Sequence, residues 1–193
     1  MRKDLPRIAV HVLSSLPLMG MIVGALTDNL GVNPIEELTH ISGESALRLL
    51  LLCLAVSPAR RLFGWRWVLP LRRPLGLWAF VYAVCHFSIF VGLDYGFDRA
   101  LLKEGFLEKP FALVGFAALV LMLPLAITST RWWIRRLKKA WKRLHRLVYV
   151  VGVLAVVHLL WLAKGGEDVV EAYVHVGILV ALLAARLLPT KRG

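Results

Sequence analysis

The stretch WKRLHRLVYVVGVLAVVHLLWLAK, residues 141–164, decides the fold class of this chain. From Arg146 onward it is long and apolar enough to cross a bilayer, because about 20 helical residues rising about 1.5 Å each span the hydrocarbon. It carries a histidine near each end, His145 and His158. An ionisable ring inside a membrane costs free energy unless it has a partner. Two interpretations follow. Either at least one imidazole binds the iron of a membrane haem, or His145 lies among lipid headgroups and His158 hydrogen-bonds a neighbouring helix.

The composition of the whole chain indicates a membrane protein. Of 193 residues, 59% are hydrophobic and only 19% are charged, and the charges cluster between apolar blocks that a soluble domain would expose to water. We predict an all-α polytopic membrane protein, a six-helix transmembrane bundle forming one domain over residues 1–193. The first block follows basic residues as a signal peptide would, but its length favours a retained helix. The helices are expected at roughly 8–27, 44–60, 75–94, 110–128, 146–163 and 169–188.

Several kinds of site are excluded by missing motifs. The two cysteines, Cys53 and Cys85, both lie in apolar blocks, which argues against a disulfide framework. No CxxCH sequence is present, so haem is not attached covalently in the c-type manner. The sequence also has no GxGxxG and no P-loop, and therefore no visible means of binding a nicotinamide dinucleotide.

The distribution of charge predicts the orientation. Most of the 24 lysines and arginines fall in the N-terminal segment, residues 57–74, residues 128–146 and the end from Arg186, together with a single acid, Asp4. The positive side faces the cytoplasm, so both termini are expected there. Topology and anionic lipid explain these basic loops, and the net charge of +12 does not require nucleic acid. The other side carries the remaining acids with few basic residues: Arg48, Arg99, Lys103, Lys109 and Lys164.

Depth in the membrane separates the histidines. Counted from the block midpoints at about 1.5 Å per residue, His86 lies about 3 Å and His158 about 5 Å to the outer side of the midplane. These two rings can face each other across a haem iron held between the third and fifth helices. His175, at about 6 Å on the outer side, is a geometric rival. His11 and His145 fall in the inner half, and His40 is expected outside, in the loop before the second helix.

Two imidazole ligands leave no open position for oxygen on a haem iron, which favours electron transfer over oxygen chemistry. His145 and His158 do not share a face of an ideal straight helix. A second haem on His145 therefore requires a distorted helix end or a differently placed partner. The alternative is that His145 contacts lipid phosphate at the interface.

Four segments resemble the MsrQ (YedZ) family, which supplies haem-binding membrane subunits to bacterial periplasmic methionine-sulfoxide reductases. They are NPIEELTHISGESALRLLLLCLAVSPARR at 33–61, RRPLGLWAFVYAVCHF at 72–87, LAITST at 125–130, and residues 141–164. The family belongs to the ferric-reductase-like and NADPH-oxidase-like transmembrane group, in which histidines on helices three and five hold b-type haem. The resemblance implies His86, His158 and His145 as haem ligands, and favours His86 over His175 as the partner of His158.

The inner cofactor site departs from the wider group. The oxidase relatives carry a second histidine on helix three, where this chain has Arg72 and Arg73, or Arg99 on the other side. The resemblance thus implies one or two b-type haems, with His11 as a candidate inner-side ligand by depth. The family is also associated with flavin mononucleotide, for which no residue here indicates a site.

The implied role is electron transfer in the bacterial inner membrane. Electrons come from the quinone pool or a cytoplasmic flavin reductase and leave for MsrP, a periplasmic molybdenum enzyme that repairs oxidised methionines. The chain is then the electron-transfer subunit rather than the catalytic one. The alternatives are a ferric-reductase-like or other transmembrane haem reductase with a different partner and, outside redox chemistry, a small transporter or assembly factor.

Overall fold

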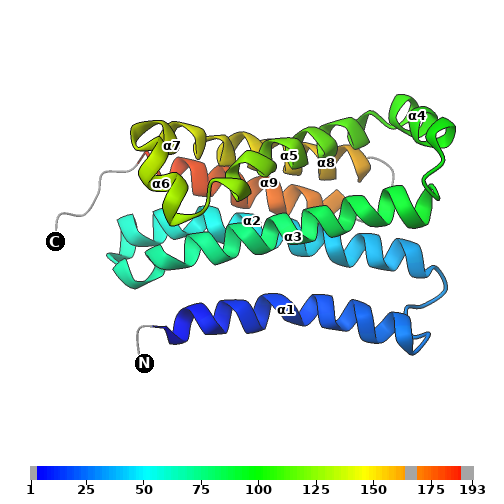
Figure 1. The fold of residues 1–193 in the computed structure, drawn as a ribbon, viewed down its shortest axis with the longest axis horizontal. Coiled ribbons are helices and arrows are strands. Elements are labelled where there is room, and N and C mark those ends of the chain that lie inside the picture. The colour runs from blue at the N-terminus through cyan, green and yellow to red at the C-terminus, as the bar shows by residue number, and fades with distance from the viewer. Residues whose placement is uncertain (1–3, 164–168, 188–193) are drawn as a thin grey trace.

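The computed structural model describes residues 4–163 and 169–187, and this part of the chain is helical throughout, without strands. Long helices lie side by side and alternate in direction (Figure 1). They are α1 (Leu5–Leu26), α2 (Pro34–Phe63), α3 (Arg72–Ile89), α5 (Pro110–Ile127), α8 (Leu147–Leu162) and α9 (Val169–Ala184). Shorter helices connect them: η1 (Arg66–Leu71), η2 (Phe90–Asp94), α4 (Arg99–Glu108), α6 (Arg131–Leu137) and α7 (Lys139–Leu144).

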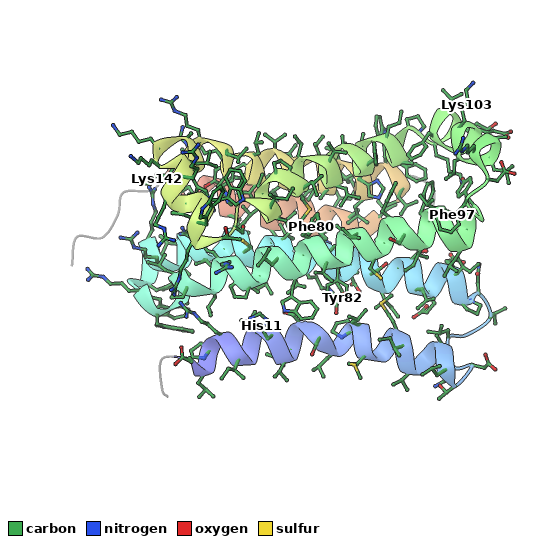
Figure 2. The ribbon with its side chains drawn as sticks, viewed as in Figure 1. His11, Phe80, Tyr82, Phe97, Lys103 and Lys142 are labelled. Atoms are coloured by element: carbon green, nitrogen blue, oxygen red, sulfur yellow. The ribbon has the colours of Figure 1, made fainter. Side chains whose placement is uncertain are left out.

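The two ends of the bundle differ in charge. Residues 57–74 and 128–146, which include α6 and α7, lie at the end where α1 begins and α9 ends (Figure 1); we call it the basic end. Residues 94–109, which include α4, lie at the opposite end, which we call the α4 end. Figure 2 shows Lys142 at the basic end, and Lys103 and Phe97 at the α4 end.

Among the described residues, four helical segments are long and apolar enough to cross a membrane: Leu5–Leu26, Arg66–Asp94, Pro110–Ile127 and Lys139–Leu162. Helix α9 is apolar but shorter. Helix α2 is long enough, but it carries charged residues along its first half. The all-helical membrane class predicted from the sequence is therefore confirmed, and four of the six predicted crossings meet the criterion by themselves.

Helix α2 begins well before the predicted Glu44. Asn33 accepts a hydrogen bond from the Glu36 amide at 3.4 Å, and Pro34 occupies the first turn, where its fixed φ fits a helix. Acidic residues in the first turn also interact favourably with the helix dipole. The predicted helix began too late because these same charged residues interrupt the apolar run. As a correction, His40 lies within α2 rather than in a loop.

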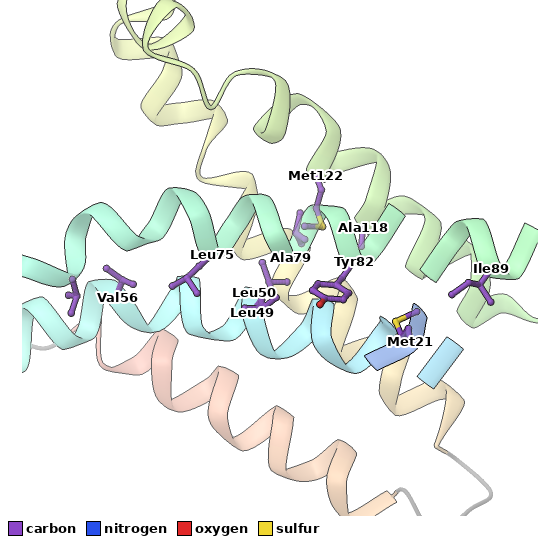
Figure 3. Close-up of a cluster of buried hydrophobic side chains, with 12 residues drawn as sticks. Met21, Leu49, Leu50, Val56, Leu75, Ala79, Tyr82, Ile89, Ala118 and Met122 are labelled. Carbon is purple, nitrogen blue, oxygen red and sulfur yellow. The ribbon is translucent and has the colours of Figure 1, made fainter. Parts of the chain in front are cut away.

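Helices α2 and α3 form the centre of the core, with α5 and α8 packed on one side and α1 on the other. Ala79 and Tyr82 of α3 are fully buried, and Leu50 of α2 is nearly so. Figure 3 shows these residues in one cluster with Ala118 of α5. Tyr82 is a large side chain in the middle of this cluster, so its hydroxyl needs a hydrogen-bond partner.

The partner of Tyr82 is the backbone of α1. The Tyr82 hydroxyl donates to the Ser14 carbonyl at 2.6 Å and accepts from the Leu18 amide at 2.9 Å. In an unbroken helix that amide would donate to that carbonyl. The hydroxyl thus contacts both partners of one helical step, next to Pro17, which itself lacks an amide hydrogen. Helix α1 is thus held to α3 through its own main chain (Figure 2).

A second proline is compensated by a side chain from another helix. Pro58 of α2 cannot donate to the Leu54 carbonyl, four residues earlier. Arg186, just after α9, donates to that carbonyl from Nη2 at 2.8 Å. Its Nη1 donates to the Tyr149 hydroxyl of α8, and its own carbonyl accepts from Arg61. Arg186 therefore joins α2, α8 and the end of α9.

We expect Arg186→Met to destabilise the bundle by about 1–3 kcal/mol, because it leaves the Leu54 carbonyl without its donor. Adding Pro58→Ala restores an amide hydrogen at that place, so the cost of Arg186→Met should be smaller in the Pro58→Ala background. Unfolding of the four proteins in detergent measures the coupling. Arg135→Met, at an exposed arginine of α6, is the control for loss of charge. If Arg186→Met destabilised the protein equally with and without Pro58→Ala, Arg186 would not be the donor that replaces the missing amide hydrogen of Pro58.

Candidate functional site

Two histidines from different helices face each other inside the bundle. His86 lies in the last turn of α3 and His158 near the end of α8, both towards the α4 end. Their ring centres are 6.2 Å apart and the ring planes are at 88°. When two imidazoles bind one metal ion from opposite sides, their ring centres also lie about 6 Å apart. This separation is the sum of two metal–nitrogen bonds of about 2 Å each and the distance from each nitrogen to its ring centre. The separation therefore fits two axial ligands of one ion.

Hydrogen bonds fix which nitrogen of each ring is available. His86 Nδ1 lies 3.0 Å from the Thr39 carbonyl of α2, and His158 Nδ1 lies 2.7 Å from the Phe111 carbonyl of α5. A carbonyl only accepts, so each Nδ1 carries the hydrogen and each Nε2 keeps its lone pair. Metal-binding histidines in proteins typically donate from the second nitrogen in this way. Both rings are thus prepared to bind through Nε2.

The two imidazoles occupy matching cradles. A Cβ added to Gly43, four residues after Thr39, would lie 3.0 Å from His86 Nδ1 and Cε1. A Cβ added to Gly115, four residues after Phe111, would lie 2.8 Å from His158 Nδ1. Residues i and i+4 share one helix face, so in each cradle a carbonyl accepts from the ring and a glycine one turn later leaves room for it. The sequence analysis did not single out either glycine.

Aromatic rings and a buried hydroxyl lie near the pair. The Phe111 ring lies 5.8 Å from the His158 ring, and Phe87, next to His86, lies 5.3 Å from Phe116. Ser42 of α2 is fully buried, and its hydroxyl donates to the Thr39 carbonyl at 3.0 Å. Apolar surroundings of a metal site control solvent access and the local dielectric, and through them the redox potential of a bound metal.

The remaining histidines are placed elsewhere. His175 is buried in α9, and its Nδ1 lies 2.8 Å from the Glu171 carbonyl of its own helix. His11 of α1 is exposed and accepts at Nδ1 from Trp78 Nε1 at 3.0 Å (Figure 2). The ring that faces His158 is therefore His86.

His145 lies at the break between α7 and α8, at the basic end. Its ring stacks on Trp141 at 3.9 Å, and its Nε2 is 3.1 Å from the Thr128 hydroxyl. That hydroxyl gives its hydrogen to the Pro124 carbonyl at 2.6 Å, so His145 Nε2 must be the donor to Thr128. In this arrangement only Nδ1 of His145 keeps a free lone pair. The helix is interrupted at His145, whose ring contacts Trp141.

Within residues 4–163 and 169–187, no group of three or more His, Cys, Asp or Glu side chains could hold a metal ion. An ion held by this pair of imidazoles would fit a cofactor that brings further ligands of its own. A haem does this, because its macrocycle supplies the four equatorial nitrogens and the protein supplies the axial ligands. The chemistry of this donor set fits a haem.

Comparison with known proteins identifies the family of the chain. Residues 42–156 match the family model described as ferric reductase like transmembrane component. The chain is 43% identical over 188 residues, 97% of its length and 87% of the relative, to the protein-methionine-sulfoxide reductase heme-binding subunit MsrQ of Ralstonia nicotianae. The chain belongs to the MsrQ family.

MsrQ proteins of other bacteria are similarly close. The chain is 44% identical to the MsrQ of Rhodospirillum rubrum over 192 residues, 99% of this chain and 91% of that protein. It is 48% identical to the MsrQ of Xanthomonas axonopodis pv. citri over 162 residues, 83% of this chain and 73% of that protein. The resemblance to the MsrQ family predicted from the sequence is confirmed, and the matches to two of these relatives cover 97% and 99% of the chain.

Proposed function

We propose that this chain is the haem-binding electron-transfer subunit of a methionine-sulfoxide reductase system, and that His86 and His158 are axial ligands of one b-type haem. The observation that carries the proposal is the facing imidazole pair, 6.2 Å apart, with both Nε2 atoms free and both Nδ1 atoms bonded to carbonyls. The relatives are named as heme-binding subunits MsrQ, which supports the same cofactor.

The protein's own residues prepare the site for electron transfer. The Thr39 and Phe111 carbonyls orient the two rings, and Gly43 and Gly115 let them approach the helices closely. A haem with two imidazole ligands supplies one-electron redox chemistry and leaves no open position for oxygen. The Phe111 ring lies 5.8 Å from the His158 ring and contributes an apolar wall on that side. We assign no residue to flavin mononucleotide.

The proposed setting is the bacterial inner membrane, with six crossings and both termini in the cytoplasm. The basic end then faces the cytoplasm, as expected from the excess of lysine and arginine there. The α4 end faces the periplasm, where an MsrP-type molybdenum reductase accepts the electrons. The donor is the quinone pool or a cytoplasmic flavin reductase. The position of His86 and His158 towards the α4 end supports electron delivery on that side.

A direct test is the absorption spectrum of the purified protein together with a pyridine haemochrome assay. We expect b-type haem bands that appear on reduction, and transfer of electrons to the periplasmic reductase once it is added. Haem without transfer to that enzyme would favour a transmembrane haem reductase with another partner. A chain purified with no haem would favour the transporter or assembly-factor alternative.

A second haem on the cytoplasmic side, held by His145 with His11 as a candidate ligand, stays a prediction. We expect His145→Ala to remove or perturb that second centre and to leave the His86/His158 haem bound, since the two sites lie at different ends of α8. The measurement is haem per chain in the wild type and the variant. One haem per chain in both, with normal electron transfer, would mean that His145 is an interfacial residue bonded to Thr128.

The periplasmic partner should recognise the acidic side chains of the α4 end. Asp94, Glu104 and Glu108 are exposed there, beside the exposed Phe97 and Leu107. A partner with a basic docking patch would be attracted to them, and the attraction is screened beyond about 10 Å at 0.1 M salt.

We therefore expect the rate of partner reduction to fall as salt rises. Replacing Asp94, Glu104 and Glu108 together by their amides should lower the rate at low salt and flatten its salt dependence. Asp98 is left intact, because its carboxylate accepts from the Ala100 amide at 2.7 Å and caps α4. A rate indifferent to both salt and substitution would indicate an apolar docking surface or another loop.

A further inference from the structure

Three arginines meet along one face of α2 at the basic end of the bundle. Arg186, just after α9, donates to the Leu54 carbonyl at 2.8 Å, and Arg72, at the start of α3, donates to the Ser57 hydroxyl at 2.7 Å. Arg61 of α2 itself donates to the Arg186 carbonyl. Positions 54, 57 and 61 are spaced i, i+3 and i+7, so they share one face of the helix. The three side chains therefore lie close together, and we call them the arginine cluster.

The chain supplies no acid to balance the charge of this cluster. Residues 45–93, 109–166 and 172–193 contain no Asp or Glu at all. At the basic end the sequence has a single acid, Asp4, and its carboxylate lies 4.0 Å from the Arg7 guanidinium. A cation at the edge of an apolar bundle is usually paired with an anion. The anion that balances the arginine cluster must therefore come from outside the protein.

The cluster also has hydrogen-bond donors to spare. Each guanidinium carries five N–H groups. The bonds to the Leu54 carbonyl and the Tyr149 hydroxyl use two donors of Arg186, and its Nε is buried without a hydrogen-bond partner in the described part of the chain. Arg72 is exposed, and its bond to Ser57 uses one donor. Arg72 and Arg186 also repel each other, so an anion that approaches Arg72 from outside meets both positive charge and available donors.

Neighbouring tryptophans indicate the depth of the cluster in the membrane. Trp65 and Trp67 lie between α2 and α3 and are 47% and 58% exposed. Exposed tryptophans of a membrane protein are typical of the boundary between hydrocarbon and water, at the level of the lipid head groups. Arg72 begins α3 only five residues after Trp67. The exposed member of the cluster is thus within reach of the lipid phosphates.

We propose that the arginine cluster binds the phosphate group of an anionic phospholipid, with Arg72 as the residue that contacts it first. A guanidinium matches two phosphate oxygens at once and is more weakly hydrated than an ammonium group. Basic sites between transmembrane helices are typical binding places for anionic head groups. Such a lipid reduces the repulsion between Arg72 and Arg186 and joins α2, α3 and the end of α9. The inference does not depend on the haem.

Arg72→Met tests the site, because it removes the exposed guanidinium and keeps an apolar stem in its place. Arg73→Met is the matched control, since this neighbouring arginine is also exposed and takes no part in the described bonds of the cluster. Arg72→Lys keeps the charge but not the planar pair of donors. Binding is followed by native mass spectrometry of the full chain in detergent, with phosphatidylglycerol or phosphatidylcholine added at equal concentration. Circular dichroism checks that each variant is helical.

We expect the wild type to retain phosphatidylglycerol and to lose phosphatidylcholine, because both have a phosphate but only the first has a net negative charge. Arg72→Met should weaken the binding of phosphatidylglycerol about tenfold, the effect of about 1.4 kcal/mol of lost affinity. Arg72→Lys should weaken it by a smaller factor, and Arg73→Met should bind like the wild type. Phosphatidylglycerol should also raise the unfolding temperature of the wild type, and should raise that of Arg72→Met much less.

Equal retention of both lipids, or a loss in Arg73→Met as large as in Arg72→Met, would overturn the proposal, because the basic end would then attract lipid only through its overall charge. If inorganic phosphate displaced the lipid and gave the same rise in unfolding temperature, the cluster would be a site for a soluble phosphate, which would also overturn it. The comparison of the two lipids and the competition with inorganic phosphate use the wild type, so they decide the question even if Arg72→Met does not fold.

Discussion

His86→Ala and His158→Ala should each remove essentially all of the haem from the purified protein. Each ring is one of only two axial ligands in the proposed site, and the remaining ring cannot hold the iron from both sides. The loss should be complete in either single variant rather than half in each, because the two imidazoles bind the same ion. A pyridine haemochrome assay normalised to protein measures it.

Two other histidines serve as controls. His175→Ala removes a buried ring that bonds within α9, and His40→Ala removes an exposed one on α2. Both variants should retain the full haem content. If His86→Ala kept its haem and His175→Ala lost it, the iron ligand opposite His158 would be His175, and the pairing seen in the structure would not be the functional one.

The second large effect is expected at the cradle glycines. In Gly115→Val the first side-chain atom alone would lie 2.8 Å from His158 Nδ1, the same atom that bonds to the Phe111 carbonyl at 2.7 Å, so we expect the ring to shift and this bond to weaken. We expect haem content to fall at least about tenfold, because displacing a ligand-orienting contact of this kind typically costs about 10–100-fold in metal affinity. Gly43→Val should act in the same direction on His86.

Alanine substitutions at Gly43 and Gly115 should differ in how much haem is lost. The Cβ of Gly43→Ala would lie at 3.0 Å from the ring, against 2.8 Å for Gly115→Ala, so the first variant should keep more haem than the second. Gly177→Val, in open space on α9, controls for a β-branched residue in a helix. Haem content and the yield of folded protein are measured together. Full haem in Gly115→Val would show that the close approach has no functional role.

The sequence predicts the helical class and the four apolar crossings that begin near residues 8, 75, 110 and 146, and these are confirmed because apolar length depends on one helix at a time. The assignment of His86 and His158 as haem ligands stays a prediction. The predicted loop position of His40 is wrong. Glu36 and Glu37 are typical of a loop between apolar blocks, but here they stabilise the first turn of α2. The haem assignment itself rests on the resemblance to a family as well as on depth.

The cradles could not be predicted in the same way. Whether Gly43 and Gly115 matter depends on which side chain from another helix approaches them, and nothing in their own helices encodes this. The same holds for Arg186, whose role depends on a carbonyl exposed by Pro58 of α2. A useful signal was present, since each proline inside a helix leaves a carbonyl that must find another donor. Pairing that donor with its carbonyl requires the structure.

The Tyr82 hydroxyl has a consequence for biosynthesis. Helix α1 leaves the ribosome first and enters the membrane before α3 exists, so its Ser14 carbonyl and Leu18 amide must then bond to each other, because lipid offers neither of them a partner. Arrival of α3 adds a bond from the Tyr82 hydroxyl to each of these two groups. These contacts are therefore formed only during assembly, and a nascent chain that stops before Tyr82 should lack this attachment of α1 to α3.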